Sequence, residues 1–235
     1  SFEPEPVPKG LDYEMWLGPA PYVPYTKDRC SNSLWWFISD YALGFIAGWG
    51  IHPMDIASWG AGAGFDATVS VEGKGEFPTE GVADTATNWF LAYKFANGLT
   101  MHFAGDPRPA EWAARYPTST SHGTAFEGKD GWVHVHRGVL DSSPAEVVKA
   151  DRASEKIKLY ESGNHVGNFV ECVRTRRKAV CDIDEAVRSE TFCQIGEIAL
   201  RLGRKVVWDP ATERFVGDEA ANRMLSRAMR GPWKL

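Results

Sequence analysis

The chain has 235 residues, of which 43% are hydrophobic and ten are tryptophan, so it can bury a sizeable core. Its formal net charge of −5 shows no basic bias, which argues against nucleic acid and anionic membranes as partners. No apolar run approaches the roughly 20 residues that a membrane span needs. The composition is typical of a globular domain.

The first 25 residues contain six prolines and predict an extended connector that enters a domain formed by residues 26–235. Proline interrupts helices and restricts the residue before it, so only a short turn is expected, at residues 11–16. Several aromatic side chains in this connector argue against disorder, because disordered segments are poor in aromatics. We therefore expect an ordered connector, with the preceding domain outside this sequence.

Residues 44–59, GFIAGWGIHPMDIASW, are the stretch most typical of a ligand site. Pro53 is tolerated only in the first turn of a helix or at a bend, so the helix either begins near Ile51 or runs from Gly44 with a bend. In both cases His52 and Asp55 lie near the helix start or the bend. Backbone N–H groups lack internal partners there and can face a ligand.

Polar residues upstream of this stretch are further candidates for substrate binding. Asp40 and Tyr41 follow an aromatic run at residues 35–37, and a few polar groups in an apolar setting are typical of a small-molecule pocket. Arg29 is a candidate to clamp an anionic or polyhydroxyl ligand, with a surface ion pair as the alternative. Trp16 and Trp36 are candidates to stack on a sugar, with core packing as the alternative.

Alternating patterns predict antiparallel strands in the middle of the chain. Residues 67–75 alternate apolar and polar side chains, and residues 87–95 and 99–103 flank Asn97-Gly98, a strong hairpin signal. A second hairpin is expected from residues 123–128 and 131–137. Its second strand places His134 and His136 on one face, which we expect to be the solvent face.

The second half of the chain predicts helices at residues 164–177, 184–202 and 219–227, and a short strand at 205–208. Asp184 is the expected cap of the middle helix and Gly203 its end. This order predicts an α+β fold with an open, mostly antiparallel sheet and helices packed on one face. The other face is expected to expose aromatics and to form the interface of a dimer or tetramer.

Several common site motifs are absent from the sequence. There is no G-x-G-x-x-G after a predicted strand, no P-loop, no G-x-S-x-G elbow and no zinc-like cysteine and histidine spacing. The sequence by itself therefore shows no dinucleotide site, no serine nucleophile and no metal site.

Short motifs along nearly the whole chain together resemble the C-terminal domain of the Gfo/Idh/MocA oxidoreductases, the relatives of glucose–fructose oxidoreductase and inositol dehydrogenase. The motifs are LDYEMWLGPAP (11–21), W-F-x-x-D-Y (36–41), G-W-G-x-H-x-x-D (48–55), H-x-x-N-F (165–169), WDP (208–210) and ANRMLSRAMRGPW (221–233). Their combination is specific, although each one alone is short.

The resemblance implies a two-domain enzyme in which a Rossmann domain binds NAD or NADP and supplies a catalytic lysine. The second domain, present here, then supplies substrate contacts and the oligomer interface. Many members carry D-x-x-x-H on the helix that matches residues 44–59, so the resemblance makes His52 the proton-transfer or substrate-hydroxyl group. That role fits its chemistry, because histidine titrates near neutrality and hydride removal from a carbinol needs a base.

The sequence departs from the family at one key position, because Gly48 stands where the aspartate of D-x-x-x-H is expected. Asp55 either compensates for this loss or is a structural partner. His165 at the start of a predicted helix is either a substrate contact or a structural residue. Without the Rossmann domain, this chain alone is not expected to bind NAD or to turn over substrate.

Three functions follow from the residues and the resemblance. The first is the substrate-binding and oligomerisation domain of an NAD(P)-dependent oxidoreductase that acts on a sugar or cyclitol hydroxyl. The second is a non-redox member, such as a glycosidase or lyase that acts on a sugar through transient oxidation. The third is a binding or scaffold domain without chemistry. The loss of the aspartate favours the last two.

Overall fold

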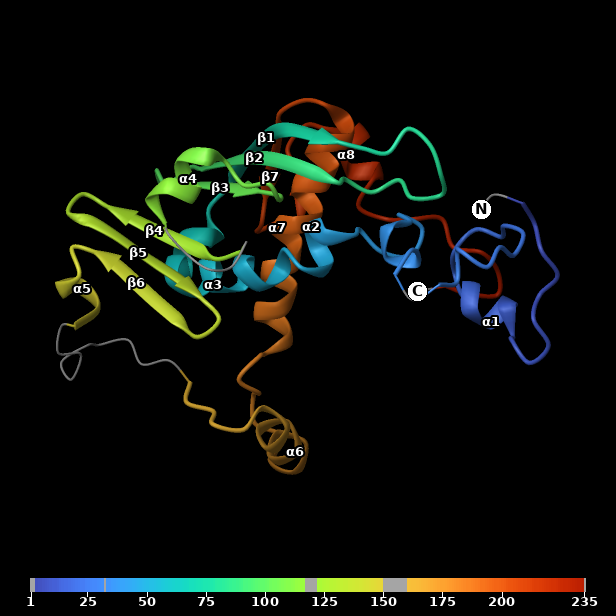
Figure 1. The fold of residues 1–235 in the computed structure, drawn as a ribbon, viewed down its shortest axis with the longest axis horizontal. Helices are drawn as coiled ribbons and strands as arrows, with labels where there is room; N and C mark the ends of the chain where they lie inside the picture. The colour runs from blue at the N-terminus through green and yellow to red at the C-terminus, as the bar shows by residue number, and fades with distance from the viewer. Residues whose placement is uncertain (1–2, 32, 117–121, 150–159, 235) are drawn as a thin grey trace.

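The computed structural model describes residues 3–31, 33–116, 122–149 and 160–234. A five-stranded sheet and a three-stranded sheet form the body of the molecule, and short helices lie at both of its ends (Figure 1). The helices are α1 (Tyr13–Leu17), α2 (Phe45–Gly48), α3 (Ile51–Ala61), α4 (Ala110–Arg115), α5 (Glu146–Lys149), α6 (His165–Thr175), α7 (Ile183–Leu202) and α8 (Glu219–Arg223), with 3-10 turns at Trp35–Phe37 and Gly62–Asp66. None of the described helices is long and apolar enough to cross a membrane.

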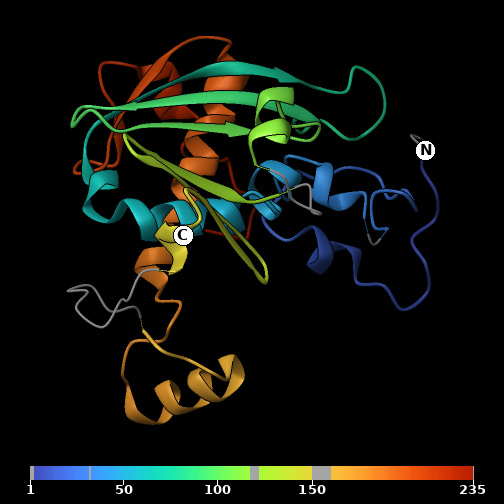
Figure 2. The ribbon, with the colours of Figure 1, turned by 60° about the vertical axis from the view of Figure 1, so that its left-hand side comes forward.

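The larger sheet is antiparallel throughout, in the order β3-β2-β1-β7-β8. Its strands are β1 (Val69–Glu76), β2 (Asn88–Phe95), β3 (Thr100–Ala104), β7 (Val206–Asp209) and β8 (Arg214–Phe215). Helix α7 packs on one face, and α3 packs on α7 (Figure 2). This arrangement confirms the predicted fold class, an open antiparallel sheet with helices on one face.

Helix α7 supplies the largest part of the helix layer, and its C-terminal half packs on β1 and β2. The hydroxyl of Tyr93 on β2 donates to the carbonyl of Phe192 at 2.8 Å, and Gly196 lets the two elements approach. The helix ends at Gly203 with φ +61, as predicted. The predicted cap was wrong by two residues, because the side chain of Asp182 accepts from the backbone N–H of Asp184.

The open face of the larger sheet is polar along its centre, so the prediction of exposed alternating aromatics is wrong there. On β1 and β2 this face carries Glu72 and Lys94, which form an ion pair at 3.7 Å. The reason lies in the register of β2, whose Tyr93 and Phe95 alternate toward the helices and are buried. Phe90 is an aromatic side chain that does lie on the open face, 40% exposed.

The smaller sheet has the order β4-β5-β6, with β4 (Thr124–Gly128), β5 (Gly131–His136) and β6 (Val139–Ser143). The hairpin of β4 and β5 was predicted, and β6 was not. Helix α3 bridges the two sheets. The hydroxyl of Thr124 donates to the carbonyl of Pro53 at 2.7 Å, and Phe126 packs directly on Gly60.

Residues near the N-terminus form a second, smaller core and not only an extended segment. Tyr13, Leu17 and Tyr25 are buried in it, and α1 overlaps the predicted turn at residues 11–16 but ends one residue later. The side chain of Arg230 joins the C-terminal segment to this core. It donates to the carbonyls of Ala20 at 3.2 Å and Gly18 at 3.0 Å, and it pairs with the carboxylate of Glu14.

Helix α6 stands away from the two sheets, below the N-terminal half of α7 (Figures 1 and 2). Its N-cap is Asn164, whose side chain accepts from the backbone N–H of Gly167 at 2.8 Å. Val166 is 70% exposed and Phe169 is 62% exposed. The apolar stripe that predicted this helix is therefore not buried by the described residues.

Candidate functional site

The break between α2 and α3 positions His52. Helix α2, with Gly44 as its N-cap, ends at Gly48, and α3 begins at Ile51, so the structure combines the two predicted arrangements. Gly50 lies at the break, where a Cβ atom would meet the ring of Phe103 at 2.5 Å. His52 therefore lies in the first turn of α3, and its side chain is exposed.

Gly48 is required by the packing of Trp36. A Cβ atom at Gly48 would lie 2.2 Å from Cζ2 and 2.3 Å from Cε2 and Nε1 of Trp36. The ring is held there by Phe37 at 5.9 Å and Phe45 at 5.3 Å between ring centroids. An aromatic ring thus occupies the space that an aspartate side chain at position 48 would need.

The ring of Trp49 lies beside His52 and also contacts His122 and Arg137. The ring of Trp49 lies 5.2 Å from that of His52 and 5.4 Å from that of His122, and the guanidinium of Arg137 lies 5.1 Å from the Trp49 ring. We call the group formed by Trp36, Phe45, Trp49, His52, His122 and Arg137 the His52 surface. Burial lowers the pKa of His122, with further lowering by His136, Arg137 and His52. His122 therefore favours the neutral imidazole, which can both donate and accept a hydrogen bond.

The side chains of Asp55 and His52 contact different residues. Its carboxylate accepts a hydrogen bond at 2.9 Å from the hydroxyl of Ser189, which is fully buried on α7. The contact fixes α3 on α7, which gives Asp55 a structural role. A catalytic role for Asp55 stays a prediction.

The remaining predicted site residues lie in two other places. Trp16, Arg29 and Tyr41 gather at the N-terminal core, where the guanidinium of Arg29 donates to the Tyr41 hydroxyl at 3.3 Å and the rings of Trp16 and Tyr41 are 5.0 Å apart. Asp40 is exposed beside Tyr41. His165 is exposed at the start of α6. Of the predicted residues, the structure thus groups Trp16 with Arg29 and Tyr41, whereas Trp36 packs on Gly48, four residues before His52.

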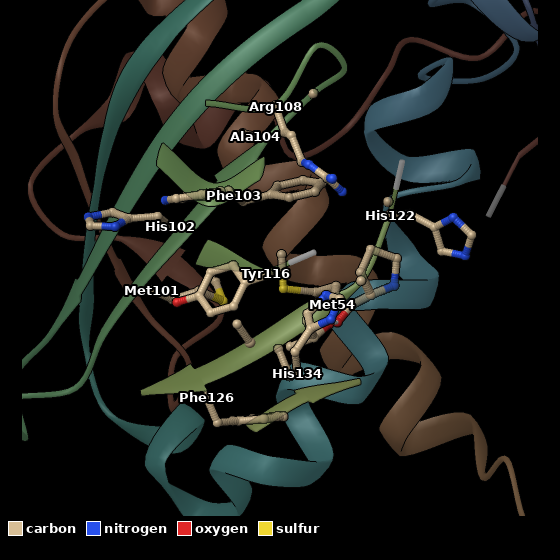
Figure 3. Close-up of a pocket in the computed structure, with 18 of the residues that line it drawn as sticks. Met54, Met101, His102, Phe103, Ala104, Arg108, Tyr116, His122, Phe126 and His134 are labelled. Atoms are coloured by element: carbon tan, nitrogen blue, oxygen red, sulfur yellow. Dashed lines mark hydrogen bonds between the residues drawn. The ribbon is translucent and has the colours of Figure 1, made fainter. Parts of the chain in front are cut away.

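A large cavity lies between the two sheets, and no sequence pattern indicated it. Its volume is about 1120 Å³, and it separates β3, the edge of the larger sheet, from β4, the edge of the smaller one. We call it the interstrand cavity. Figure 3 shows side chains around it from β3, α3, the second sheet and the segment after β3, namely Met54, Met101, Phe103, Arg108, Tyr116, His122, Phe126 and His134.

The expectation that His134 and His136 face solvent is wrong, because they are only 4% and 5% exposed. Tyr116 and His122 lie against these two histidines. Tyr116 stacks on His134 at 5.5 Å, and the ring of His122 lies 6.2 Å from that of His136. Burial lowers the pKa of His134, with further lowering by His136 and Arg108.

Comparison with protein-family models shows to which family this chain belongs. Residues 1–235 match the model described as "Oxidoreductase family, C-terminal alpha/beta domain", the second C-terminal domain type of Gfo/Idh/MocA. The chain belongs to the Gfo/Idh/MocA oxidoreductases. The resemblance drawn from the short motifs is thereby confirmed. A search of curated proteins finds no match to this chain.

Three solved structures are similar to this chain at low identity. The WlbA dehydrogenase from Bordetella pertussis, solved with NADH and UDP-GlcNAcA, is 14% identical with a TM-score of 0.49, over 76% of this chain and 48% of that one. An NAD-binding protein from Listeria innocua is 14% identical with a TM-score of 0.49, over 75% and 56%. UDP-N-acetylglucosamine 3-dehydrogenase GnnA from Acidithiobacillus ferrooxidans is 15% identical with a TM-score of 0.43, over 81% and 56%.

The chain spans about half the length of these solved structures. Within this Gfo/Idh/MocA domain, the described residues do not fit a dinucleotide. A Rossmann site needs parallel strands and a glycine-rich turn into a helix, whereas every described strand pair here is antiparallel. Nor do the described residues place three or more histidine, cysteine, aspartate or glutamate side chains together as metal ligands.

Proposed function

We propose that this chain is the substrate-binding and oligomerisation domain of an NAD(P)-dependent oxidoreductase that acts on a sugar or cyclitol hydroxyl. The observation that carries the proposal is the exposed His52 in the first turn of α3, with the ring of Trp49 beside it. Family membership supports the reaction class.

In this proposal His52 takes the proton of the substrate hydroxyl while the carbinol is oxidised. A positioned general base contributes typically 10²–10⁴-fold to such a step. The aromatic rings of Phe45, 47% exposed, and Trp49, 36% exposed, supply flat apolar surface for the carbon face of a sugar ring. Arg137, held over Trp49, and His122 supply hydrogen-bond donors for further hydroxyl groups.

The hydride acceptor would be NAD or NADP held by a Rossmann domain, because the described residues of this chain offer no cradle for it. Trp16, Arg29, Asp40, Tyr41 and His165 remain proposed substrate contacts. They lie apart from the His52 surface within this domain, so each would need to meet the substrate from another side. A homo-oligomer through the open sheet face also remains a proposal, and a monomer in light scattering at micromolar concentration would refute it.

The test uses the full-length protein, with sugars and cyclitols as substrates and the absorbance of the reduced nicotinamide as the readout. His52→Asn should lower kcat/KM by about 10²-fold or more while leaving the Kd for NAD unchanged. Unchanged kcat/KM in this variant would exclude His52 as the base. No reduction of either nicotinamide with any polyol would count against the redox reading as a whole.

A second candidate, a non-redox enzyme that acts on a sugar through transient oxidation, is favoured by one observation. The Trp36 ring fills the space beside Gly48, so no carboxylate precedes His52 on the helix. Such an enzyme would cleave a glycoside with no net change in cofactor. Measuring sugar release and cofactor reduction in the same reaction separates the two functions.

A further inference from the structure

Four apolar side chains of α6 share one helix face and are largely exposed. Val166, Phe169, Val170 and Val173 recur at the i, i+3, i+4, i+7 spacing of a single face and are 70%, 62%, 42% and 48% exposed. We call them the α6 stripe. A helix in a protein gains most of its stability by burying such a face against another element. The described residues leave the α6 stripe exposed, so another body is needed to bury it.

The opposite face of α6 is fixed by hydrogen bonds to the segment that leads into α7. The side-chain carbonyl of Asn168 accepts from the backbone N–H of Val180 at 3.0 Å, and the thiol of Cys172 donates to the carbonyl of Lys178 at 3.4 Å. Asn168 and Cys172 are four residues apart and lie on the face away from the α6 stripe. These hydrogen bonds therefore hold the stripe facing away from its own connecting segment.

An apolar groove on α7 is a second exposed surface, which we call the α7 groove. Its volume is about 430 Å³, and its lining includes Ile183 and Val187, which are 72% and 52% exposed. Its charged lining residue, Glu190, is engaged in a side-chain hydrogen bond at 2.6 Å within α7. Ile51 also lines the groove and directly precedes His52 on α3. A body that reaches His52 from outside this domain would therefore adjoin the α7 groove.

We propose that the α6 stripe and the α7 groove are the docking surface for the domain of the same enzyme that holds NAD or NADP. The inference rests on the proposed function, in which that domain brings the nicotinamide to His52. Helix α3, which carries His52, and α6 both lie on the helix side of the larger sheet (Figures 1 and 2). A domain placed against His52 from that side faces the groove and the stripe together.

The chemistry of the two surfaces fits a permanent partner. Obligate interfaces are more hydrophobic than transient ones and resemble a protein core cut in half. Large apolar patches that stay exposed on a monomer are rare, and they usually mark an interaction site. The family model that matches this chain describes a C-terminal domain, which fits a partner domain in the same polypeptide.

Hydroxyl-radical footprinting of the full-length protein tests the docking. Val170 on α6 and Val147 on α5 are a matched pair, because both are helical valines and they are 42% and 43% exposed in this domain. Docking predicts that Val170 is oxidised several-fold more slowly than Val147. Equal rates would overturn the proposal. Protection of Val170 that disappears when the protein is diluted to its monomer would also overturn it, because a second copy would then be the occupant.

A charged substitution tests whether the stripe and the groove meet the same partner. Phe169→Glu, on the stripe, should raise the oxidation rate of Val187 in the groove several-fold, whereas the control Val147→Glu should leave that rate unchanged. Circular dichroism checks that Phe169→Glu is folded; if it is not, the wild-type comparison of Val170 with Val147 decides. An unchanged rate at Val187 in folded Phe169→Glu would show that the two surfaces do not share a partner and would refute the docking surface.

The footprint separates this inference from the proposed function, because it does not depend on catalysis. If Val170 is protected in a protein that reduces neither nicotinamide with any polyol, the docking surface stands and the proposed redox reaction fails. If a polyol is oxidised while Val170 reacts as fast as Val147, the reaction stands and the docking surface fails.

Discussion

Replacing Gly48 by alanine should destabilise the protein, although alanine is the better helix former. In a helix, alanine is favoured over glycine by about 1 kcal/mol, so helix propensity alone predicts a gain in stability. The packing predicts the opposite. The new Cβ would lie 2.2 Å from Trp36, where carbon atoms ordinarily sit about 3.5–4.0 Å apart.

The size of the loss in the free energy of unfolding depends on how far the Trp36 ring must move. The Trp36 ring would have to shift by more than about 1 Å, and Phe37 and Phe45 pack against it. Overpacking of this kind costs about 1–3 kcal/mol. We expect a net loss of about 2 kcal/mol in the free energy of unfolding, which lowers Tm by roughly 4–8 °C in a chain of this length.

Urea unfolding followed by far-ultraviolet circular dichroism measures this loss without relying on tryptophan emission. Gly64→Ala is the control, because its Cβ would meet Leu99 at an ordinary 3.4 Å. In a Trp36→Leu background the cost of Gly48→Ala should shrink, which a double-mutant cycle detects. A stabilised Gly48→Ala variant, or a cost that is the same in both backgrounds, would show that the Trp36 ring does not fill this space.

Three further predictions concern α7, the buried histidine and the C-terminal helix. Gly196→Ala places a Cβ 2.3 Å from the Tyr93 hydroxyl, so it should cost about 1–3 kcal/mol in urea unfolding, and Tyr93→Phe should relieve most of that cost. Folding lowers the pKa of His134 from 6.5, so the unfolded chain binds more protons than the folded one as pH falls below 6.5. The free energy of unfolding should therefore drop between pH 7 and 5, and it should drop less in His134→Phe. The Arg204 hydrogen bond lowers the pKa of Asp218 to about 2 from 3.8, so Asp218→Asn should lower Tm at pH 7, with the difference fading as pH falls toward 2.

Elements defined by local chemistry were predictable from the sequence. Asn97-Gly98 produced the hairpin of β2 and β3, with Gly98 at φ +91, and the 3.6-residue period together with Gly203 defined α7. Strand β6 was missed because Val139–Ser143 is short and exposed and has no apolar alternation. Strand β8 has only two residues, below the length at which a period can be seen.

The burial of His134 and the interstrand cavity could not be predicted from such sequence patterns. Alternation identifies which side chains share a sheet face, but not which face a distant segment covers. Here the cover comes from Tyr116 and His122, and the cavity walls come from β3, α3 and β4. Contacts of this kind depend on how two separate sheets are placed on one helix. The position of His52 was predictable because proline and glycine fix a helix start locally.

The contacts of Arg230 can form only after nearly the whole chain has been synthesised. Its partners Ala20, Gly18 and Glu14 precede it by 210, 212 and 216 residues. At about 5–20 residues per second, a ribosome needs roughly 10–40 seconds to make the intervening chain. During that time the N-terminal segment lacks the hydrogen bonds and the ion pair that Arg230 gives it.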